Sequence, residues 1–235
     1  MKKTIALLSI AVLGSMTITS CKKKGCTDPT AANYNDKAKK DDGTCKYTPK
    51  ITITGSTDTT ISVGSSFTDP GATATNHDGS SATITTDNQV DSSTVGIYYV
   101  NYSATNDNGT STAQRKVTVA IQQDNWTVSW NVTSNCGTTT FPLASGPTIS
   151  AGSTPNDLVI DGMFTLVGGS ANATIDGNHI TIPQQTVSVT VGDINFSGTG
   201  TMQPDGKTII ITYTYENTAP LIGGSGTCVA TYVKQ

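Results

Sequence analysis

Beyond residue 50 the chain is poor in the residues that favour helices and rich in those that favour strands and turns. Residues 51–235 contain a single glutamate (Glu216), three lysines and four leucines, while Thr, Ser, Asn and Gly supply most of the polarity. Helices favour Leu, Glu and Lys, whereas strands favour Thr and the other β-branched residues. Short alternating apolar runs separated by turn residues therefore predict an all-β chain.

Residues 51–120 contain the first group of predicted strands. Every second residue from Tyr98 to Ala104 is apolar or aromatic, as expected of a strand that buries one face. The tetrapeptide at 106–109, Asn-Asp-Asn-Gly, is typical of a hairpin turn. Shorter runs complete the unit: Ile51–Ile53, Ile61–Val63 and Val117–Val119. Short strands joined by turns within about 70 residues predict a small β-sandwich.

The same segment contains sequence blocks of a known family: Asp69-Pro70-Gly71-Ala72-Thr73-Ala74, Asp78-Gly79, Val95–Tyr98 and Tyr102–Asn106. They resemble a bacterial immunoglobulin-like domain, of a group long of unknown function that also occurs in insecticidal crystal proteins. The resemblance implies an Ig-like sandwich with an extracellular spacer or adhesion role and no catalytic residues. Family members commonly carry aspartate where Asn76 stands, so acidic loop chemistry is weakened here.

Residues 125–235 form the second predicted unit. Asp176-Gly177 and Asp205-Gly206 are strong hairpin turns. Hairpins in series predict an antiparallel meander that closes into a barrel or a sandwich, and the sequence leaves both open. The unit is similar to C-terminal β domains of other Bacteroidetes-type lipoproteins. After a first strand around Trp130, the predicted strands are Leu158–Ile160, Phe164–Val167, Ala173–Ile175, Ile180–Ile182, Val187–Val191, Ile194–Phe196, Ile209–Tyr215 and Val229–Val233.

Two tryptophans mark the first strand of this unit. Trp126, Val128, Trp130 and Val132 occupy alternate positions, which predicts that they share one face. The indole rings suit either stacking on sugar rings or packing in a core. Their shared face with two valines favours the core.

Residues 1–20 have the layout of a secretory signal peptide. Lys2 and Lys3 precede an apolar run, Ile5–Ile18, that is too short to span a bilayer comfortably. The sequence Ile18-Thr19-Ser20-Cys21 resembles a bacterial lipobox, which implies that Cys21 carries the lipid and becomes the mature N-terminus. An ordinary signal peptide followed by a chance cysteine is the alternative.

The charges divide sharply along the chain. Residues 21–50 hold eight lysines against four aspartates, a net charge of +4, whereas residues 51–235 have a net charge of −9. A basic segment beside a lipid favours an anionic membrane surface. The acidic body argues against nucleic acid as a partner.

Residues 21–50 are predicted to form a disulfide-stapled stalk. Excluding Cys21, the chain has Cys26, Cys45, Cys136 and Cys228, and an even number in an exported protein indicates disulfides. Of three connectivities we favour Cys26–Cys45 and Cys136–Cys228, because each pair lies inside one compositional unit. The run from Cys26 to Cys45 resembles a short module of exported Bacteroidetes-type proteins, although that module often has another cysteine where Ala32 stands.

Acidic turns offer candidate ligands for a calcium ion. None follows the EF-hand spacing, and solvated turn residues are the favoured interpretation. A zinc site is disfavoured because the chain has no C-x-x-C and only His77 and His179 as helpers. The candidate calcium ligands are Asp28, Asp36, Asp41, Asp42, Asp69, Asp78 and Asp107.

The sequence offers little for catalysis. It lacks H-E-x-x-H, G-x-x-x-x-G-K-[ST] and G-x-S-x-G, and Gly223–Gly226 lacks the final glycine of the last motif. We therefore expect no enzymatic activity. An envelope hydrolase, built from aspartates or from a carboxylate with His179, remains an alternative.

These features predict a lipid-anchored protein of the cell envelope, at the outer membrane, with its face toward the periplasm or the outside left open. We expect it to act in binding, adhesion or as a spacer, with a protein or glycan as ligand. A small-ligand carrier with a lipocalin-like barrel is the first alternative. The long polar connections Gly137–Asn156 and Asn217–Gly226, both beside the predicted Cys136–Cys228 bond, are expected at one end of the domain as its functional loops.

Overall fold

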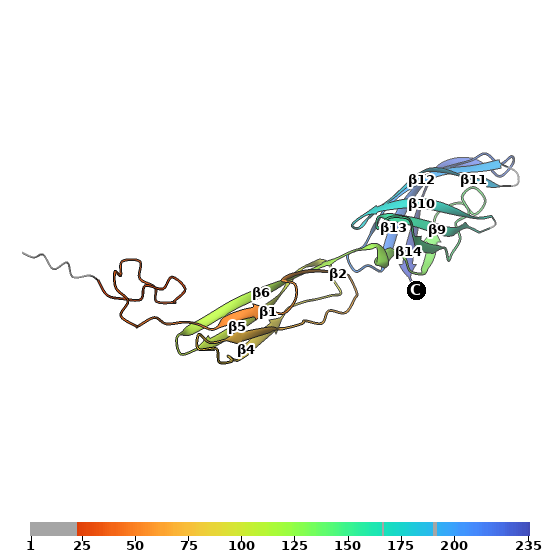
Figure 1. The fold of residues 1–235 in the computed structure, drawn as a ribbon. Helices are drawn as coiled ribbons and strands as arrows, with labels where there is room; N and C mark the ends of the chain where they lie inside the picture. The colour runs from red at the N-terminus through yellow and green to blue at the C-terminus, as the bar shows by residue number, and fades with distance from the viewer. Residues whose placement is uncertain (1–22, 166, 190–191) are drawn as a thin grey trace, which may run out of the picture.

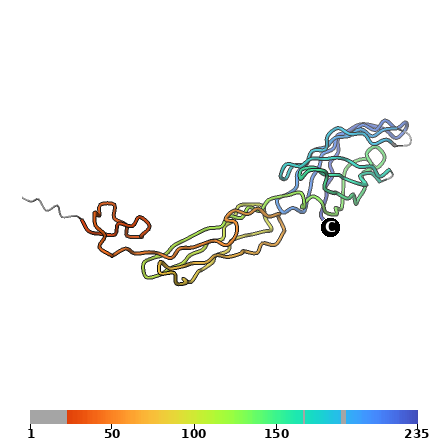
Figure 2. The backbone as a smooth tube through the Cα atoms, viewed as in Figure 1, coloured from red at the N-terminus to blue at the C-terminus, as the bar shows by residue number. Residues whose placement is uncertain are grey.

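The computed structural model describes residues 23–165, 167–189 and 192–235. The predicted signal peptide and the predicted lipidation site, Cys21, lie outside the described residues. A loop-rich module, an Ig-like sandwich and a barrel follow one another along an elongated molecule (Figures 1 and 2). Regular structure is nearly all β, which confirms the predicted fold class. Among the helical segments that the structure describes, none has the length and apolar character needed to cross a membrane.

The stalk, residues 23–49, consists of turns and bends. A disulfide joins Cys26 to Cys45, and an isolated bridge pairs Lys24 with Lys40. Cys26 and Ala31 are buried apolar residues of the stalk. So small a module cannot bury a sizeable core, so the disulfide and its turn hydrogen bonds hold its shape.

Two sheets form the Ig-like sandwich. Strand β2 runs parallel to β6, and the other pairs are antiparallel. Val100, Tyr102 and Val117 are buried between the sheets. The smaller sheet pairs β1 (Lys50–Ile53) with β3 (Ala72–Thr75); the larger has the order β2 (Asp58–Ser62), β6 (Gly109–Ala120), β5 (Gly96–Asn106), β4 (Ile84–Asn88).

An eight-stranded antiparallel sheet forms the C-terminal unit, in the order β7-β14-β13-β12-β11-β10-β9-β8. An isolated bridge between Ser129 and Thr148 links its two edges, so the sheet is a nearly closed barrel. The structure thus decides between the barrel and the sandwich that the sequence had left open. The strands are β7 (Trp130–Ser134), β8 (Thr148–Ala151), β9 (Asp157–Phe164), β10 (Gly168–Asp176), β11 (His179–Val189), β12 (Gly192–Met202), β13 (Thr208–Asn217) and β14 (Gly224–Lys234).

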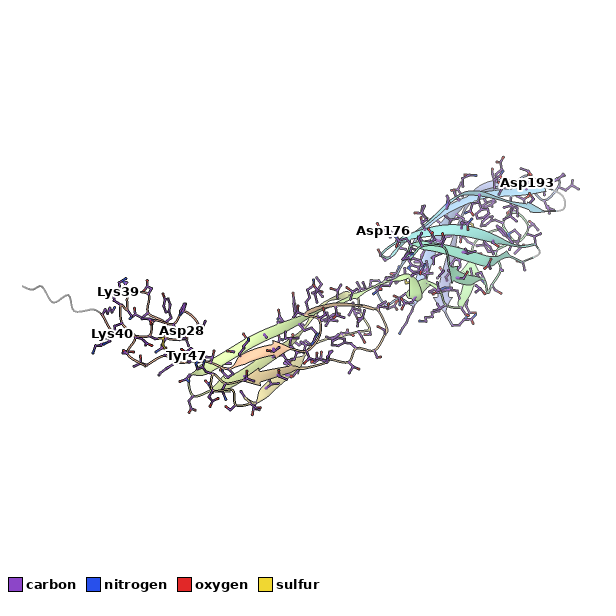
Figure 3. The ribbon with its side chains drawn as sticks, viewed as in Figure 1. Asp28, Lys39, Lys40, Tyr47, Asp176 and Asp193 are labelled. Carbon is purple, nitrogen blue, oxygen red and sulfur yellow. A yellow bond between two sulfur atoms is a disulfide. The ribbon has the colours of Figure 1, made fainter. Side chains whose placement is uncertain are left out.

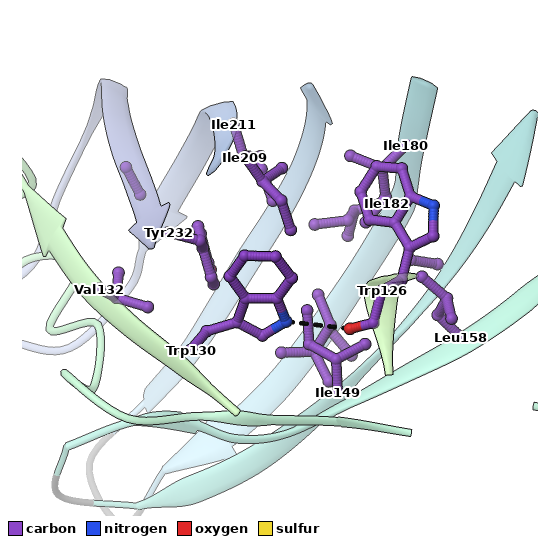
Figure 4. Packing of buried hydrophobic residues seen from close by; sticks show 14 of the residues in the cluster. Trp126, Trp130, Val132, Ile149, Leu158, Ile180, Ile182, Ile209, Ile211 and Tyr232 are labelled. Carbon is purple, nitrogen blue, oxygen red and sulfur yellow. Dashed lines mark hydrogen bonds between the residues drawn. The ribbon is translucent and has the colours of Figure 1, made fainter. Parts of the chain in front are cut away.

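The prediction of one strand through both tryptophans was wrong. Trp126 ends a single helical turn, α1 (Gln123–Trp126), and strand β7 begins only at Trp130. Both side chains are fully buried, and the Nε1 of Trp130 donates a hydrogen bond to the carbonyl oxygen of Trp126 at 2.9 Å (Figure 4). The rings therefore belong to the barrel core, and no face of either is open for a sugar.

Other strand limits also differ from the prediction. Of the predicted strand Phe164–Val167, Phe164 is the last residue of β9, and Val167 is 40% exposed in the connection to β10. The apolar runs at 180–182 and 187–189 belong to one strand, β11, which has a register irregularity between Ile182 and Gln185. Strand β8 was not predicted at all.

Candidate functional site

The barrel has two distinct ends, because successive hairpins turn at opposite ends of an up-and-down meander. The base carries the β8–β9, β10–β11 and β12–β13 connections. The far end carries residues 135–147 and the β9–β10 and β13–β14 connections. Figure 3 marks the two ends: Asp176 lies on the side of the Ig-like unit, and Asp193 lies at the end away from it.

The disulfide between Cys136 and Cys228 ties the segment 135–147 to strand β14, as expected from the sequence. At this far end Asn217 Nδ2 donates a hydrogen bond to the carbonyl oxygen of Thr140 at 3.1 Å. The hydroxyl groups of Thr140 and Tyr215 lie 3.2 Å apart. These contacts fix the segment 135–147 beside the β13–β14 connection.

The β13–β14 connection presents two adjacent apolar side chains to solvent. Leu221 is fully exposed and Ile222 is 47% exposed. Leu221 has a φ of 73°, a left-handed conformation that costs a non-glycine residue about 1–2 kcal/mol. The turn is closed by a hydrogen bond from the Gly223 amide to the carbonyl oxygen of Ala219 at 2.8 Å. We call Leu221 and Ile222 the apolar tip.

The predicted loop from Gly137 to Asn156 is only partly at this end. Residues 148–151 form strand β8, which leads back to the base. There the Gln123 side-chain amide donates to the carbonyl oxygens of Thr154 and Asp157, at 2.9 and 2.8 Å. The prediction that the whole loop gathers at one end was therefore wrong for residues 148–156.

The Ig-like unit is joined to the base of the barrel by specific contacts. Asn125 Nδ2 donates to the carbonyl oxygen of Val63 at 2.8 Å, and the Ser62 hydroxyl donates to Asp124 at 2.7 Å. Val63 and Val119 are also part of the barrel's buried cluster. Buried side chains and hydrogen bonds together therefore join the two units at this end of the barrel.

The stalk is likewise joined to the Ig-like unit. The ring of Tyr47 stacks on His77 with centroids 3.6 Å apart, and its hydroxyl donates to Asp28 at 2.7 Å. The Tyr47 carbonyl oxygen accepts hydrogen bonds from the side chains of Asn106 and Asn108, at 3.0 and 3.2 Å. The hydrogen bond to the Asp28 carboxylate raises the pKa of Tyr47.

The candidate calcium ligands are mostly engaged in local turns. The carboxylate of Asp28 accepts hydrogen bonds from the backbone amide of Thr30 and from the hydroxyl of Tyr47. Both bonds lower the pKa of Asp28, and the bond from Thr30 has the larger effect. Side-chain hydrogen bonds from Thr44 and Ser80 lower the pKa values of Asp42 and Asp78. Asp41 accepts from the Gly43 amide, Asp69 pairs with Arg115, and Asp36 and Asp107 lie in exposed turns. Across the described residues, His, Cys, Asp and Glu side chains nowhere gather in threes suited to a metal ion.

The suspected catalytic groups are divided between the two ends of the barrel. His179 opens strand β11 beside Thr201, close to the base. Glu216 lies near the far end of β13, opposite Asn195 and Ser225, and is exposed. Gly224 and Gly226 belong to strand β14. Asp176 is the cross-strand partner of His179 at the β10–β11 turn, where both residues are exposed, and Glu216 lies at the other end of the barrel.

The barrel interior is filled by large side chains. Phe141 from the far-end segment contacts Phe164, Phe196, Tyr213 and Tyr215, with ring centroids 4.8–5.9 Å apart. Below it, the hydroxyl groups of Tyr213 and Tyr232 lie 2.7 Å apart in the buried core. A lipocalin-like carrier needs an open apolar cavity inside its barrel. In this barrel, packed aromatic rings occupy that space.

Two comparisons with known proteins gave matches, one to a solved structure and one to a family of domains. A lipoprotein from Bacteroides thetaiotaomicron of known crystal structure is 17% identical in sequence, and the match covers 80% of this chain and 100% of that chain with a TM-score of 0.30. No curated protein matches the chain. Residues 51–119 match the family described as bacterial surface protein, Ig-like domain, and this match agrees with the resemblance seen in the sequence.

Proposed function

We propose that the protein is a non-catalytic, lipid-anchored protein of the cell envelope, at the outer membrane, and that it binds a partner protein through the far end of its barrel. The observation that carries this proposal is the arrangement of three units in series, with side-chain contacts at both junctions (Figure 1). A lipid at Cys21 would anchor the stalk, so the far end of the barrel would point away from the membrane.

The apolar tip supports this role for the far end. The β13–β14 turn exposes leucine and isoleucine side by side and holds Leu221 in a strained conformation. Both features are energetically unfavourable in a turn that contacts only solvent. Exposed apolar side chains that lie side by side are a feature of protein–protein interaction sites. Loops fixed on a rigid sheet are also where binding residues usually lie.

The alternatives have less support. The packed aromatic interior disfavours a small-ligand carrier. A hydrolase would need a cleft that joins activated groups. His179 and its cross-strand partner Asp176 are both exposed at the β10–β11 turn, and Glu216 lies at the other end of the barrel.

The experiment uses the full chain with Cys21→Ser, so that the exported protein can be purified without its lipid. We expect partner proteins captured from the native envelope to be lost when Leu221→Ser and Ile222→Ser are combined. The matched control combines Val229→Ser and Val233→Ser, which removes two exposed apolar side chains from the barrel wall. Capture that survives the tip variant, or that is lost only in the wall variant, contradicts a contact through the far end.

A further inference from the structure

A shallow hollow of about 640 Å³ lies on the outer face of the four-stranded sheet of the Ig-like unit. It lies away from the barrel's far end and plays no part in the function proposed above. Six outward-facing polar side chains from three strands surround it, and we call them the polar face: Thr85, Asp87, Asn101, Ser103, Thr112 and Gln114.

The strand register arranges the polar face in two rows. Thr85, Ser103 and Thr112 are direct neighbours across β4, β5 and β6, and they form a row of hydroxyl groups. Asp87 and Gln114 flank Asn101 in the adjacent row. The floor between the rows is backbone, because the side chain of Tyr102 points into the core and is 1% exposed.

The second row is held in place by its own hydrogen bonds. Gln114 Nε2 donates to Asn101 Oδ1 at 2.8 Å, and Asn101 Nδ2 lies 3.5 Å from Asp87 Oδ2. From the strand's end, Gln89 Nε2 donates to the same Asp87 oxygen at 2.9 Å. These contacts order the side chains before any ligand arrives, which reduces the entropy lost on binding.

The second row still has hydrogen-bonding groups available for a ligand. Each primary amide has two donor hydrogens and an acceptor oxygen, and each carboxylate has two acceptor oxygens. Within the described part of the chain, neither Gln114 Oε1 nor Asp87 Oδ1 takes part in a hydrogen bond. The row therefore has acceptor oxygens left at Asp87 and Gln114 and further amide hydrogens at Asn101 and Gln114, which is the mixture of groups that sugar hydroxyls can bond.

An aromatic ring borders the row. Tyr99 precedes Asn101 by two residues on β5, so it lies on the same face, and it is 37% exposed. Beyond it Ile97 is 58% exposed. Tyrosine offers a flat apolar surface together with a polar tip, which suits the C–H face of a pyranose ring.

The charges around the hollow decide which kind of sugar fits. Asp87 is the one charged residue that lines it, and Lys116 farther along the face is paired with Asp58 at 2.7 Å. A phosphate or uronate ligand would face an uncompensated carboxylate. A peptide strand would need free backbone groups, but this face lies over strands already paired within the sheet.

We propose that the polar face, with Tyr99, is a binding site for a neutral oligosaccharide. Asp87, Asn101 and Gln114 hydrogen-bond the hydroxyl groups of one or two sugar units, and Tyr99 packs against the adjoining ring. This site acts independently of the contact made by the apolar tip.

The test measures binding of neutral gluco-, manno-, galacto- and xylo-oligosaccharides to the full chain with Cys21→Ser, by saturation-transfer NMR and calorimetry. We expect at least one of them to bind, and we expect binding to weaken at least tenfold when Asn101→Ala and Gln114→Ala are combined. Tyr99→Ala should weaken it similarly. Circular dichroism and thermal melting check that the variants remain folded.

The matched control combines Thr105→Ala and Thr110→Ala. These hydroxyl groups bond to each other at 2.7 Å on the same two strands, beyond the hollow. Binding by this control and by the Leu221→Ser, Ile222→Ser variant should stay within twofold of the parent. The proposal is overturned if no neutral oligosaccharide binds, if the Asn101, Gln114 variant binds as well as the parent, or if acidic oligosaccharides are preferred.

Discussion

The guanidinium of Arg115 donates from Nε to Oδ1 of Asp69 at 2.9 Å inside the Ig-like sandwich, where the arginine side chain is 1% exposed. The other guanidinium nitrogens bond to the carbonyl oxygens of Ser56, Thr54 and Gly71, the last two at 2.7 and 3.3 Å. One side chain on β6 therefore fastens the β1–β2 connection and the segment that leads into β3. Asp69, the first residue of a sequence block that resembles the family, therefore has a structural role in this chain.

Replacing Arg115 by methionine should unfold the Ig-like unit at a much lower temperature. The change leaves Asp69 as a largely buried carboxylate without its partner and several carbonyl oxygens without a donor. Breaking one half of a buried ion pair typically costs about 3–5 kcal/mol. Lys116→Met, which breaks the exposed pair with Asp58, is the control and should cost no more than about 1 kcal/mol. Equal melting temperatures for the two variants would contradict this account.

The tyrosine pair in the barrel core should behave as a coupled unit. Tyr213 and Tyr232 are both buried, and each supplies the hydrogen-bond partner of the other. Tyr232→Phe leaves the Tyr213 hydroxyl buried without that partner and should lower the free energy of unfolding by about 1–3 kcal/mol. Adding Tyr213→Phe should restore part of this loss, since both polar groups are then gone. Urea unfolding of the four proteins in a double-mutant cycle measures the coupling; strictly additive losses would refute it.

The same pair predicts a loss of stability in alkali. Burial is the main cause that raises the pKa of Tyr213, and burial raises the pKa of Tyr232 to about 12. In the unfolded chain a tyrosine releases its proton near pH 10, so between about pH 10 and 12 the unfolded state holds fewer protons than the folded state. Stability is therefore fully present below about pH 10 and decreases as the pH rises toward 12. The double phenylalanine variant should show a flatter decrease in melting temperature over this interval than the parent protein.

The disulfide between Cys136 and Cys228 should be the main covalent support of the barrel. It closes a loop of 92 residues, for which the chain-entropy model gives a stabilisation of about 4–5 kcal/mol. Replacing both cysteines by alanine should lower the melting temperature of the barrel and increase proteolysis of residues 137–147. Replacing Cys26 and Cys45 is the control, and it should loosen the stalk alone. Non-reducing peptide mapping of exported protein should recover Cys26 with Cys45 and Cys136 with Cys228; crossed linkages would refute the pairing.

Lipidation of Cys21 is expected from its lipobox-like sequence and can be tested directly. Cys21→Ser should release the protein from the membrane fraction, because the basic stalk alone binds an anionic surface weakly and in a salt-dependent way. Fractionation with and without a high-salt wash measures this release. Sedimentation of the variant with membranes after the wash would mean that another anchor exists.

Several features of this protein were determined by short stretches of sequence. The glycines of Asp176-Gly177 and Asp205-Gly206 have φ angles of 57° and 67°, which glycine adopts easily. These dipeptides therefore form hairpin turns through their own backbone preference. The alternation from Tyr98 to Ala104 placed the buried face of β5 correctly, with Val100, Tyr102 and Ala104 in the core. Such features are local, because side-chain period and turn geometry depend on neighbours along the chain.

Other features were decided by contacts between residues far apart in the sequence. The bridge from Ser129 to Thr148 makes the second unit a barrel, and strand β8, whose apolar pattern is too short to be recognised, exists through its pairing with β9. Trp126 lies in a helical turn and not in the predicted strand, and its ring packs in the barrel core. The polar face arises only when register places Asp87 and Gln114 on either side of Asn101. Register is set by which faces must be buried across a whole sheet, and no single strand contains that information.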